Sequence, residues 1–158
     1  GLTSICLAFP IHDQITVLPF LVDSNYWGVS QSDAHRRFCL KLLANRYDIR
    51  QVAFDRWKNG QFILDCGLNA VQFGQGFASM SEPTRSLQER IRQNTIKHPD
   101  NQGLNKMVFD AKLVSDAVGN IKPCYATGDT PIIGMVAMIM ACALAENQPP
   151  DSHHGNIR

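Results

Sequence analysis

The stretch IRQVAFDRWKNGQFILDCGLNAVQF, residues 49–73, decides the fold class of this 158-residue chain. It opens with a short strand-like run, residues 49–55, that ends in Asp55. A helical segment follows from about residue 58 to 66 and stops at Gly67, and residues 69–73 read as a second short strand. Strands that alternate with helices predict an α/β fold in which part of the sheet is parallel. Asp55 is then expected at the carboxyl end of a strand, where such sheets bind ligands.

The rest of the chain extends this alternation of strands and helices. Residues 2–10 and 15–22 are rich in strand formers and predict a hairpin around a polar turn, residues 11–14. Pro19 cannot donate a ladder hydrogen bond, which indicates an edge position or a bulge. Helices are predicted at residues 33–47, 81–94 and 104–114, with a glycine-bearing loop at 74–81 and a turn at 116–123. We expect one domain, residues 1–146, and a polar, disordered tail, residues 147–158.

Residues 132–145 form an apolar run of fourteen residues without a charge. A bilayer requires about 20 apolar residues, so this run is too short for a membrane span. Its composition predicts a core helix that is buried on nearly every side. Pro131 suits the first turn of that helix, and Thr130 or Asp129 suits its N-cap.

The distribution of charge is more informative than the net charge of +1. Fourteen of the fifteen Lys and Arg residues lie between Arg36 and Lys122, together with eight acids, which leaves about +6 in that stretch. A basic middle is typical of a protein with a polyanionic partner, although solvated helix faces produce the same pattern. The candidates for contact with nucleic acid are Arg56, Lys58, Arg92, Lys97 and Lys122.

Cysteine and histidine patterns argue against several kinds of site. The five cysteines include no CxxC pair, which indicates reduced, mostly buried thiols in a cytosolic protein. The histidines show no zinc-ligand spacing, no P-loop is present, and no secretion signal opens the chain. Asp55 is the one acid that ends an apolar strand, and it suits a hard cation. The alternative is a structural acid that caps the following helix or pairs with Arg56 or Lys58.

Three sequence blocks resemble a known family. FDRW (residues 54–57), FGQGFASMS (73–81) and GNIKP (119–123) are similar to blocks of the nuclease domain of the large terminase subunit of tailed bacteriophages, and the resemblance covers residues 2–146. It implies an RNase H-like mixed sheet flanked by helices. It also implies a metal-dependent endonuclease that cuts viral DNA during packaging, with two Mg²⁺ or Mn²⁺ ions held by carboxylates.

The same resemblance implies a setting and partners for the chain. These are double-stranded DNA, the small terminase and the portal, in the cytoplasm of a bacterial host and without a membrane role. A separate ATPase domain drives packaging in the family. A small-molecule-binding α/β module is the unrelated alternative.

This sequence departs from the family pattern at the metal ligands. Asp55 matches the middle acid, but Ile133 stands where the family has its last acid, and Asp129 is only a weak substitute. The family's first central strand, which carries another Asp, precedes Gly1 in the alignment. We therefore expect a gap in the sheet between residues 2–9 and 51–55. We also expect a catalytically impaired domain, or alternatively a non-catalytic, prophage-derived remnant that binds DNA or packaging proteins.

Overall fold

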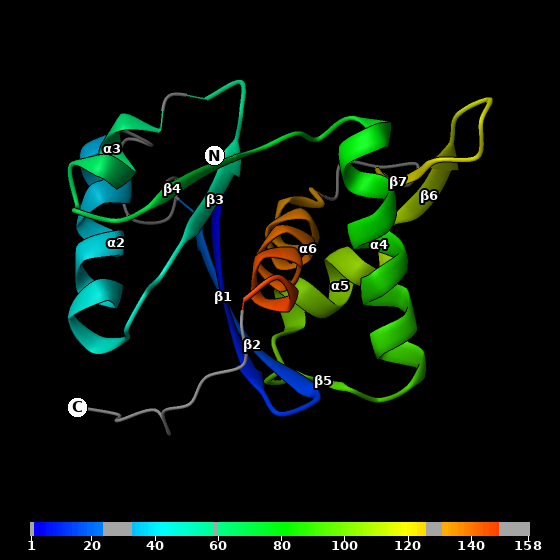
Figure 1. Cartoon of the computed structure of the whole chain (residues 1–158), viewed down its shortest axis with the longest axis horizontal. Helices are drawn as coiled ribbons and strands as arrows, with labels where there is room; N and C mark the ends of the chain where they lie inside the picture. The colour runs from blue at the N-terminus through cyan, green and yellow to red at the C-terminus, as the bar shows by residue number, and fades with distance from the viewer. Residues whose placement is uncertain (1, 24–32, 59, 126–130, 149–158) are drawn as a thin grey trace.

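The computed structural model describes residues 2–23, 33–58, 60–125 and 131–148. Helices lie on both sides of a central group of strands, with α2 and α3 on one side and α4, α5 and α6 on the other (Figure 1). In chain order the elements are β1 (Leu2–Ile11), β2 (Gln14–Asp23), α2 (Asp33–Arg46), β3 (Val52–Asp55), α3 (Gln61–Leu64), β4 (Ala70–Phe73), α4 (Phe77–Arg92), β5 (Ile96–Lys97), α5 (Gln102–Asp110), β6 (Lys112–Ser115), β7 (Ile121–Cys124) and α6 (Ile133–Glu146).

The hairpin β1–β2 is longer and its turn tighter than the sequence predicts. The antiparallel register runs without a break from Leu2 opposite Asp23 to Ile11 opposite Gln14. Only two residues remain for the turn, and His12 adopts φ 57° there. The unbroken register contains no bulge at Pro19. β5 pairs in parallel with Ile15 and Thr16 alone, so the predicted edge position of Pro19 is confirmed within the described residues.

The parallel pairing predicted for residues 49–73 is confirmed. β3 and β4 run in parallel, with Val52 opposite Ala70 and Asp55 opposite Phe73. The strands of the described residues form three separate sheets, namely β1–β2–β5, β3–β4 and β6–β7. β1 and β3 therefore do not pair with each other, and the expected gap between them is present in the hydrogen-bonding pattern.

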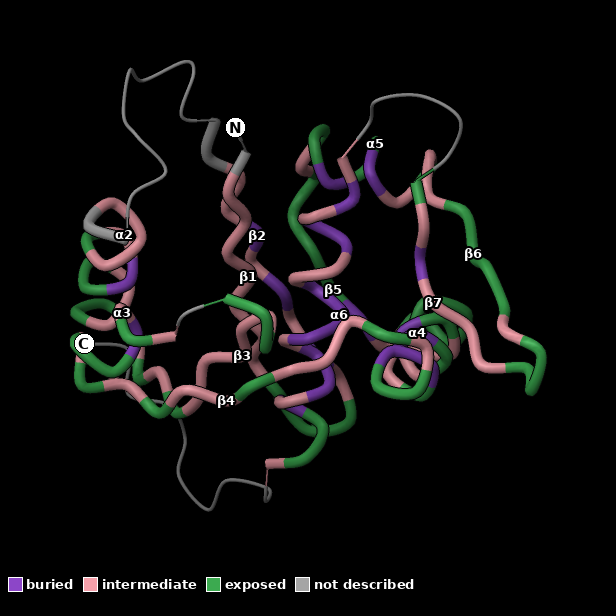
Figure 2. Tube along the Cα trace, turned by 90° about the horizontal axis from the view of Figure 1, so that it is seen from above, coloured by how far each residue is buried: buried purple, intermediate pink, exposed green. Residues whose placement is uncertain are grey.

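Helix α6 forms the centre of the core, as its composition predicts. Its side chains pack with those of β1, β2, α4 and α5, and Figure 2 shows buried residues along it. Ile139 is fully buried, as is Val17 of β2. Gly134 permits close packing in the first turn, because a Cβ there would lie 2.8 Å from the Met107 sulfur and 3.1 Å from a Leu21 methyl. The helix begins at Ile133, so Pro131 precedes it, and the N-cap candidates Thr130 and Asp129 lie outside the described residues.

The predicted bounds of two other helices were wrong. Helix α4 begins at Phe77, within the segment predicted as a glycine-bearing loop, and Pro83 lies inside it. Burial of Met80 and the hydrogen bond from the Ile121 N–H to the Ser81 hydroxyl stabilise these early turns. Helix α5 ends at Asp110, and the predicted remainder of that helix forms the exposed strand β6 instead. The short helix α3 occupies only part of its predicted range.

The cysteines are free, but they are less buried than predicted. Only Cys142 is buried, while Cys6, Cys39, Cys66 and Cys124 are half-buried. Burial raises the pKa of both Cys6 and Cys142 to about 12. Their thiols are therefore protonated and unreactive at neutral pH. No helix in the described part of the chain is both long and apolar enough to cross a bilayer.

Candidate functional site

Asp55 is held at the carboxyl end of β3 by a tight turn. Its carboxylate Oδ1 accepts a hydrogen bond from the Trp57 N–H at 3.1 Å, and its carbonyl accepts one from the Lys58 N–H at 2.8 Å. The Arg56 N–H donates to the Phe73 carbonyl at 3.1 Å, which ties the turn to the end of β4. Asp55 therefore has a structural role in this turn, rather than capping α3 as the alternative interpretation proposed. Asp55 as a whole residue is half-buried, and it lies at the strand end where α/β proteins bind ligands.

The described residues do not fit a pair of metal ions at Asp55. Ile133 is the first residue of α6 and offers no oxygen or nitrogen ligand from its side chain. Asp129 lies outside the described residues. Across residues 2–23, 33–58, 60–125 and 131–148, no three His, Cys, Asp or Glu side chains lie close enough to share an ion. Two-ion sites need several carboxylates around ions that are about 4 Å apart. One placed carboxylate does not meet that requirement.

Two cations directly follow the carboxyl end of β3 and a third lies on β7, and we call Arg56, Lys58 and Lys122 the cationic edge. The guanidinium of Arg56 lies 5.1 Å from the centre of the Trp57 ring, and one of its nitrogens lies 3.6 Å from the position that a Cβ of Gly74 would occupy. The Lys122 ammonium lies 4.8 Å from the centre of the Phe77 ring, at the start of α4. Arg56 and Lys122 thus lie at the two ends of the segment that connects β4 to α4, since Arg56 approaches Gly74 and Lys122 approaches Phe77.

The cationic edge keeps its charge available. Other cations of the described residues form ion pairs with acids, among them Arg37, Arg90, Arg92 and Lys106. In Figure 1 the ends of β3 and β4 and the start of α4 all lie toward the upper end of the molecule. The N-terminus of α4 adds a partial positive charge from the helix dipole. No acidic residue in the first turn of α4 neutralises this charge.

The structure separates the other two predicted DNA contacts from this edge. Arg92 is the last residue of α4 and pairs with Glu89, while Lys97 belongs to β5. At 1.5 Å per residue, Phe77 and Arg92 lie about 23 Å apart along α4. Arg92 and Lys97 therefore form a second, distant candidate contact.

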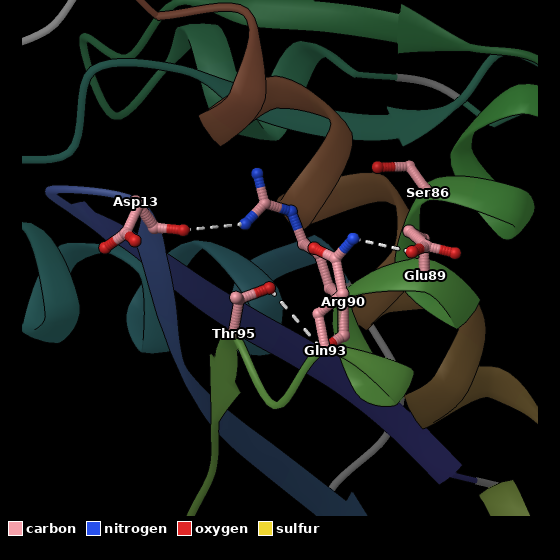
Figure 3. Close-up of a pocket in the computed structure, with 6 residues that line it drawn as sticks. All are labelled: Asp13, Ser86, Glu89, Arg90, Gln93 and Thr95. Atoms are coloured by element: carbon pink, nitrogen blue, oxygen red, sulfur yellow. Dashed lines mark hydrogen bonds between the residues drawn. The ribbon is translucent and has the colours of Figure 1, made fainter.

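A surface pocket lies at the opposite end of the molecule from Asp55. Its volume is about 290 Å³, and its lining residues are Asp13, Ser86, Glu89, Arg90, Gln93 and Thr95. Figure 3 shows the Arg90 guanidinium reaching toward Asp13, whose carbonyl accepts a hydrogen bond from it at 3.3 Å. Arg90 also pairs with Glu146 at the end of α6, and Ser86 donates to the same carboxylate at 2.6 Å. These contacts join α4 to α6 and to the β1–β2 turn. The polar residues that line the pocket therefore have a structural role, and we assign no ligand to the pocket.

Trp57 is a surface feature that the sequence did not single out as a site residue. Its side chain is 79% exposed, although it belongs to the FDRW block. The sequence offered one signal for it, a large aromatic residue that directly follows Asp55 and Arg56 and stands before Lys58.

Comparison with known proteins identifies relatives of the chain. The family described as "Terminase large subunit, endonuclease domain" matches residues 23–148. The large terminase subunit of Enterobacteria phage HK97 is 33% identical over 107 residues, which are 65% of this chain and 21% of that protein. The chain therefore spans about a fifth of the length of this curated relative.

Solved structures show the same fold. The crystal structure of the HK97 large terminase matches with a TM-score of 0.78 and 26% identity, over 91% of this chain and 36% of that one. The terminase nuclease of the thermophilic phage G20c matches with a TM-score of 0.65 and 13% identity, over 89% of this chain and 82% of that domain. The G20c nuclease has also been solved with bound cobalt and with bound magnesium. The RNase H-like α/β fold predicted from the sequence is confirmed.

Proposed function

This chain belongs to the family of terminase large subunit endonuclease domains, and from that premise we propose that it binds the double-stranded DNA of a packaging phage but cuts it poorly or not at all. The observation that carries this proposal is the arrangement at the ends of β3 and β4. Asp55 is the one predicted carboxylate ligand among the described residues there, and Arg56 and Lys58 follow it directly in the chain.

The cationic edge suits contact with a phosphate backbone. Arg56, Lys58 and Lys122 come from two connected parts of the fold, and the side chains of Arg56 and Lys122 rest against aromatic rings that restrict them. Cations that neutralise phosphates release counterions, which makes binding strongly dependent on salt. Arg92 and Lys97 form a second contact if the duplex follows α4. A distance of about 23 Å corresponds to about seven nucleotides along a strand at 3.4 Å each.

Weak catalysis follows from the set of donor atoms. When bound, the divalent ions activate water and stabilise the leaving oxygen in two-ion nucleases, and they need carboxylates from several elements. The family resemblance implies Mg²⁺ or Mn²⁺ as the metal. Asp55 is the one predicted ligand among the described residues, since the Ile133 side chain offers no donor and Asp129 lies outside them. We therefore derive no cleavage step from this site.

The related proposal is a purely binding role in packaging. A domain that retains the fold and the basic surface, with Asp55 as the one predicted ligand among its described residues, can still hold DNA or contact the small terminase or the portal. The setting that we propose for such a role is the cytoplasm of the bacterial host. The basic surface favours DNA as the first partner to test, because its contacts are located on the structure.

One pair of assays tests this proposal. Dye-labelled duplex DNA reports binding by anisotropy, and supercoiled plasmid with Mn²⁺ reports cleavage. With three phosphate contacts the affinity falls about 40-fold between about 50 and 200 mM salt. Lys122→Ala should lower the salt slope by about 0.9, whereas Lys106→Ala, which removes a lysine already paired with Asp110, serves as the matched control. Salt-independent binding, or robust cleavage that Asp55→Ala abolishes, would contradict the proposal.

A further inference from the structure

Trp57 is exposed to an extent that packing does not explain. Its side chain is 79% exposed, whereas large aromatic side chains are usually mostly buried. Exposure of a single large apolar side chain is common on protein surfaces, so exposure alone identifies nothing. The surroundings of this side chain carry the argument.

The backbone that bears Trp57 is fixed. The Trp57 N–H donates to the Asp55 carboxylate, the Lys58 N–H donates to the Asp55 carbonyl, and the Arg56 N–H donates to the Phe73 carbonyl. The turn is thus anchored to both strands of the β3–β4 sheet. A ring presented from an anchored turn loses little conformational freedom when a ligand stacks on it.

The ring already stacks with a cation. The Arg56 guanidinium lies 5.1 Å from its centre, and this guanidinium packs against Gly74 at the end of β4. The ring is held in this contact while most of its surface faces solvent. Lys58 follows directly in the chain, and the side chain of Lys58 is also exposed.

An exposed aromatic ring on an anchored turn, between Arg56 and Lys58 in the chain, is a combination that suits unpaired nucleotides. Each base has a flat face that stacks on an aromatic ring, while the cations contact the neighbouring phosphates. In a continuous duplex these faces are covered by neighbouring bases. The ring therefore gains nothing from an intact duplex and gains a stacking partner from a single strand.

Building on the proposed DNA-binding function, we propose that Trp57 is a stacking platform for an unpaired base, so that this chain prefers DNA with single-stranded or frayed segments to continuous duplex. Arg56 holds the ring in place, and the rest of the cationic edge contacts the flanking phosphates. Trp57 acts in binding and positioning, and this role does not depend on a metal ion.

Fluorescence provides a direct test, because the chain has only two tryptophans, Trp27 and Trp57. In a Trp27→Phe variant, Trp57 is the single tryptophan reporter. Titration with an oligothymidine should quench its emission, and an equimolar intact duplex should quench it far less. Absence of quenching by bound oligothymidine would overturn the proposal.

Affinity measurements give the second arm. Trp57→Ala should weaken binding of dye-labelled oligothymidine about five- to hundredfold, leave duplex binding nearly unchanged, and be partly rescued by Trp57→Phe. Phe109→Ala is the matched control, since Phe109 is 89% exposed on α5 and lies outside the cationic edge. Equal losses for both substitutions, or equal losses for both kinds of DNA, would contradict stacking.

The same experiments distinguish this proposal from the broader proposal of DNA binding. Duplex affinity and its salt slope are measured on the dye-labelled duplex, and they test the broader proposal independently of Trp57. A melting curve for each variant checks folding.

Discussion

Asp55 shows how one side chain serves a structural and a candidate chemical role together. Its carboxylate closes the turn after β3 by accepting the Trp57 N–H, and the same turn presents Trp57 and Lys58 to solvent. Ordinary strand-end chemistry therefore accounts for the acid without any metal. The contrast with Ile133, which begins α6 and has an apolar side chain, defines what this site lacks.

Restoring the missing acid should not create a nuclease. Ile133→Asp supplies one carboxylate at the start of α6, and an acid in the first turn of a helix is itself tolerated or mildly stabilising. Two ions need further ligands, so we expect no Mn²⁺-dependent cleavage of supercoiled plasmid by this variant. If Ile133→Asp cleaves plasmid and the double variant Ile133→Asp with Asp55→Ala does not, two carboxylates are sufficient for cleavage.

Thr84 offers a residue whose replacement should stabilise the fold. It is 1% exposed on α4, and its hydroxyl has no hydrogen-bond partner among the described residues. Thr84→Val keeps the shape and removes the unpaired polar group, so the free energy of unfolding should rise by about 1 kcal/mol in a urea melt. Thr95→Val is the control, because that hydroxyl donates to the Arg90 carbonyl, and its loss should not stabilise. A lower midpoint for Thr84→Val would indicate a bound water or another unseen partner.

At the scale of elements, the sequence predicted whether a segment is a helix or a strand better than it predicted the residues at which the element begins and ends. The hairpin, the β3–α3–β4 unit and the apolar helix follow from periodicity and from glycine at Gly67, which takes φ 73° after α3. The start of α4 was missed because Pro83 and Ser81 look like a helix start, whereas burial of Met80 extends the helix back to Phe77. The two-residue strand β5 and the exposed strand β6 carry no alternating pattern, so their pairing depends on tertiary contacts that sequence does not reveal.

At the candidate site, too, features that depend on local sequence were predictable, and features that depend on the tertiary fold were not. Asp55 and its place at a strand end were predictable from an apolar run that ends in an acid. The separation of Arg92 from Arg56 was not, because it depends on the direction of α4 rather than on local composition. Trp57 needed the structure, since a tryptophan in a sequence is most often buried at least in part.

The β6–β7 hairpin contains a turn that the Asp116 carboxylate closes with several hydrogen bonds. The Asp116 carboxylate accepts hydrogen bonds from the Asn120 side chain at 2.9 Å and from the N–H groups of Asn120 and Val118. The Asn120 amide contributes most to lowering the pKa of Asp116 below its ordinary value. A carboxylate with a depressed folded-state pKa stabilises the turn above its unfolded pKa, and that contribution disappears as the pH falls through the folded value.

NMR titration of the Asp116 carboxyl group checks this expectation. The pKa should lie below that of a model aspartate, and Asn120→Ala should raise it toward the ordinary value. Amide exchange in residues 112–124 should accelerate in Asp116→Ala at neutral pH. An Asp116 pKa that does not change in Asn120→Ala would show that the backbone N–H groups alone hold the carboxylate.

At the scale of the whole molecule, one helix spans two sheets that do not join. Helix α6 packs against β1 and β2 of one sheet and against β3 of the other. Figure 1 shows β1 and β3 on the same side of α6. The core is therefore continuous through the helix while the hydrogen-bonded layer is divided. Stability in this arrangement comes from side-chain packing around Ile139 and Val17 rather than from an uninterrupted ladder.

The divided layer should make the chain prone to association. Within the described residues, β1 pairs only with β2 and β3 pairs only with β4, so each has one edge without a strand partner. Most residues along both edges are half-buried, and a backbone group that becomes buried there without a partner costs about 1–3 kcal/mol. Several such groups rival a total stability of about 5–15 kcal/mol. Exposed strand edges also pair readily with other chains.

We therefore expect either a second strand that fills the division or a marginal, self-associating monomer. Size-exclusion chromatography over a tenfold range of concentration, with a melting curve at each concentration, distinguishes the cases. Association through the edges should make both the elution volume and the melting temperature depend on concentration, since a partner that binds only the folded state stabilises it by mass action. A chain that elutes as a monomer throughout, with a high and constant melting temperature, would show that packing on α6 alone compensates for the unpaired edges.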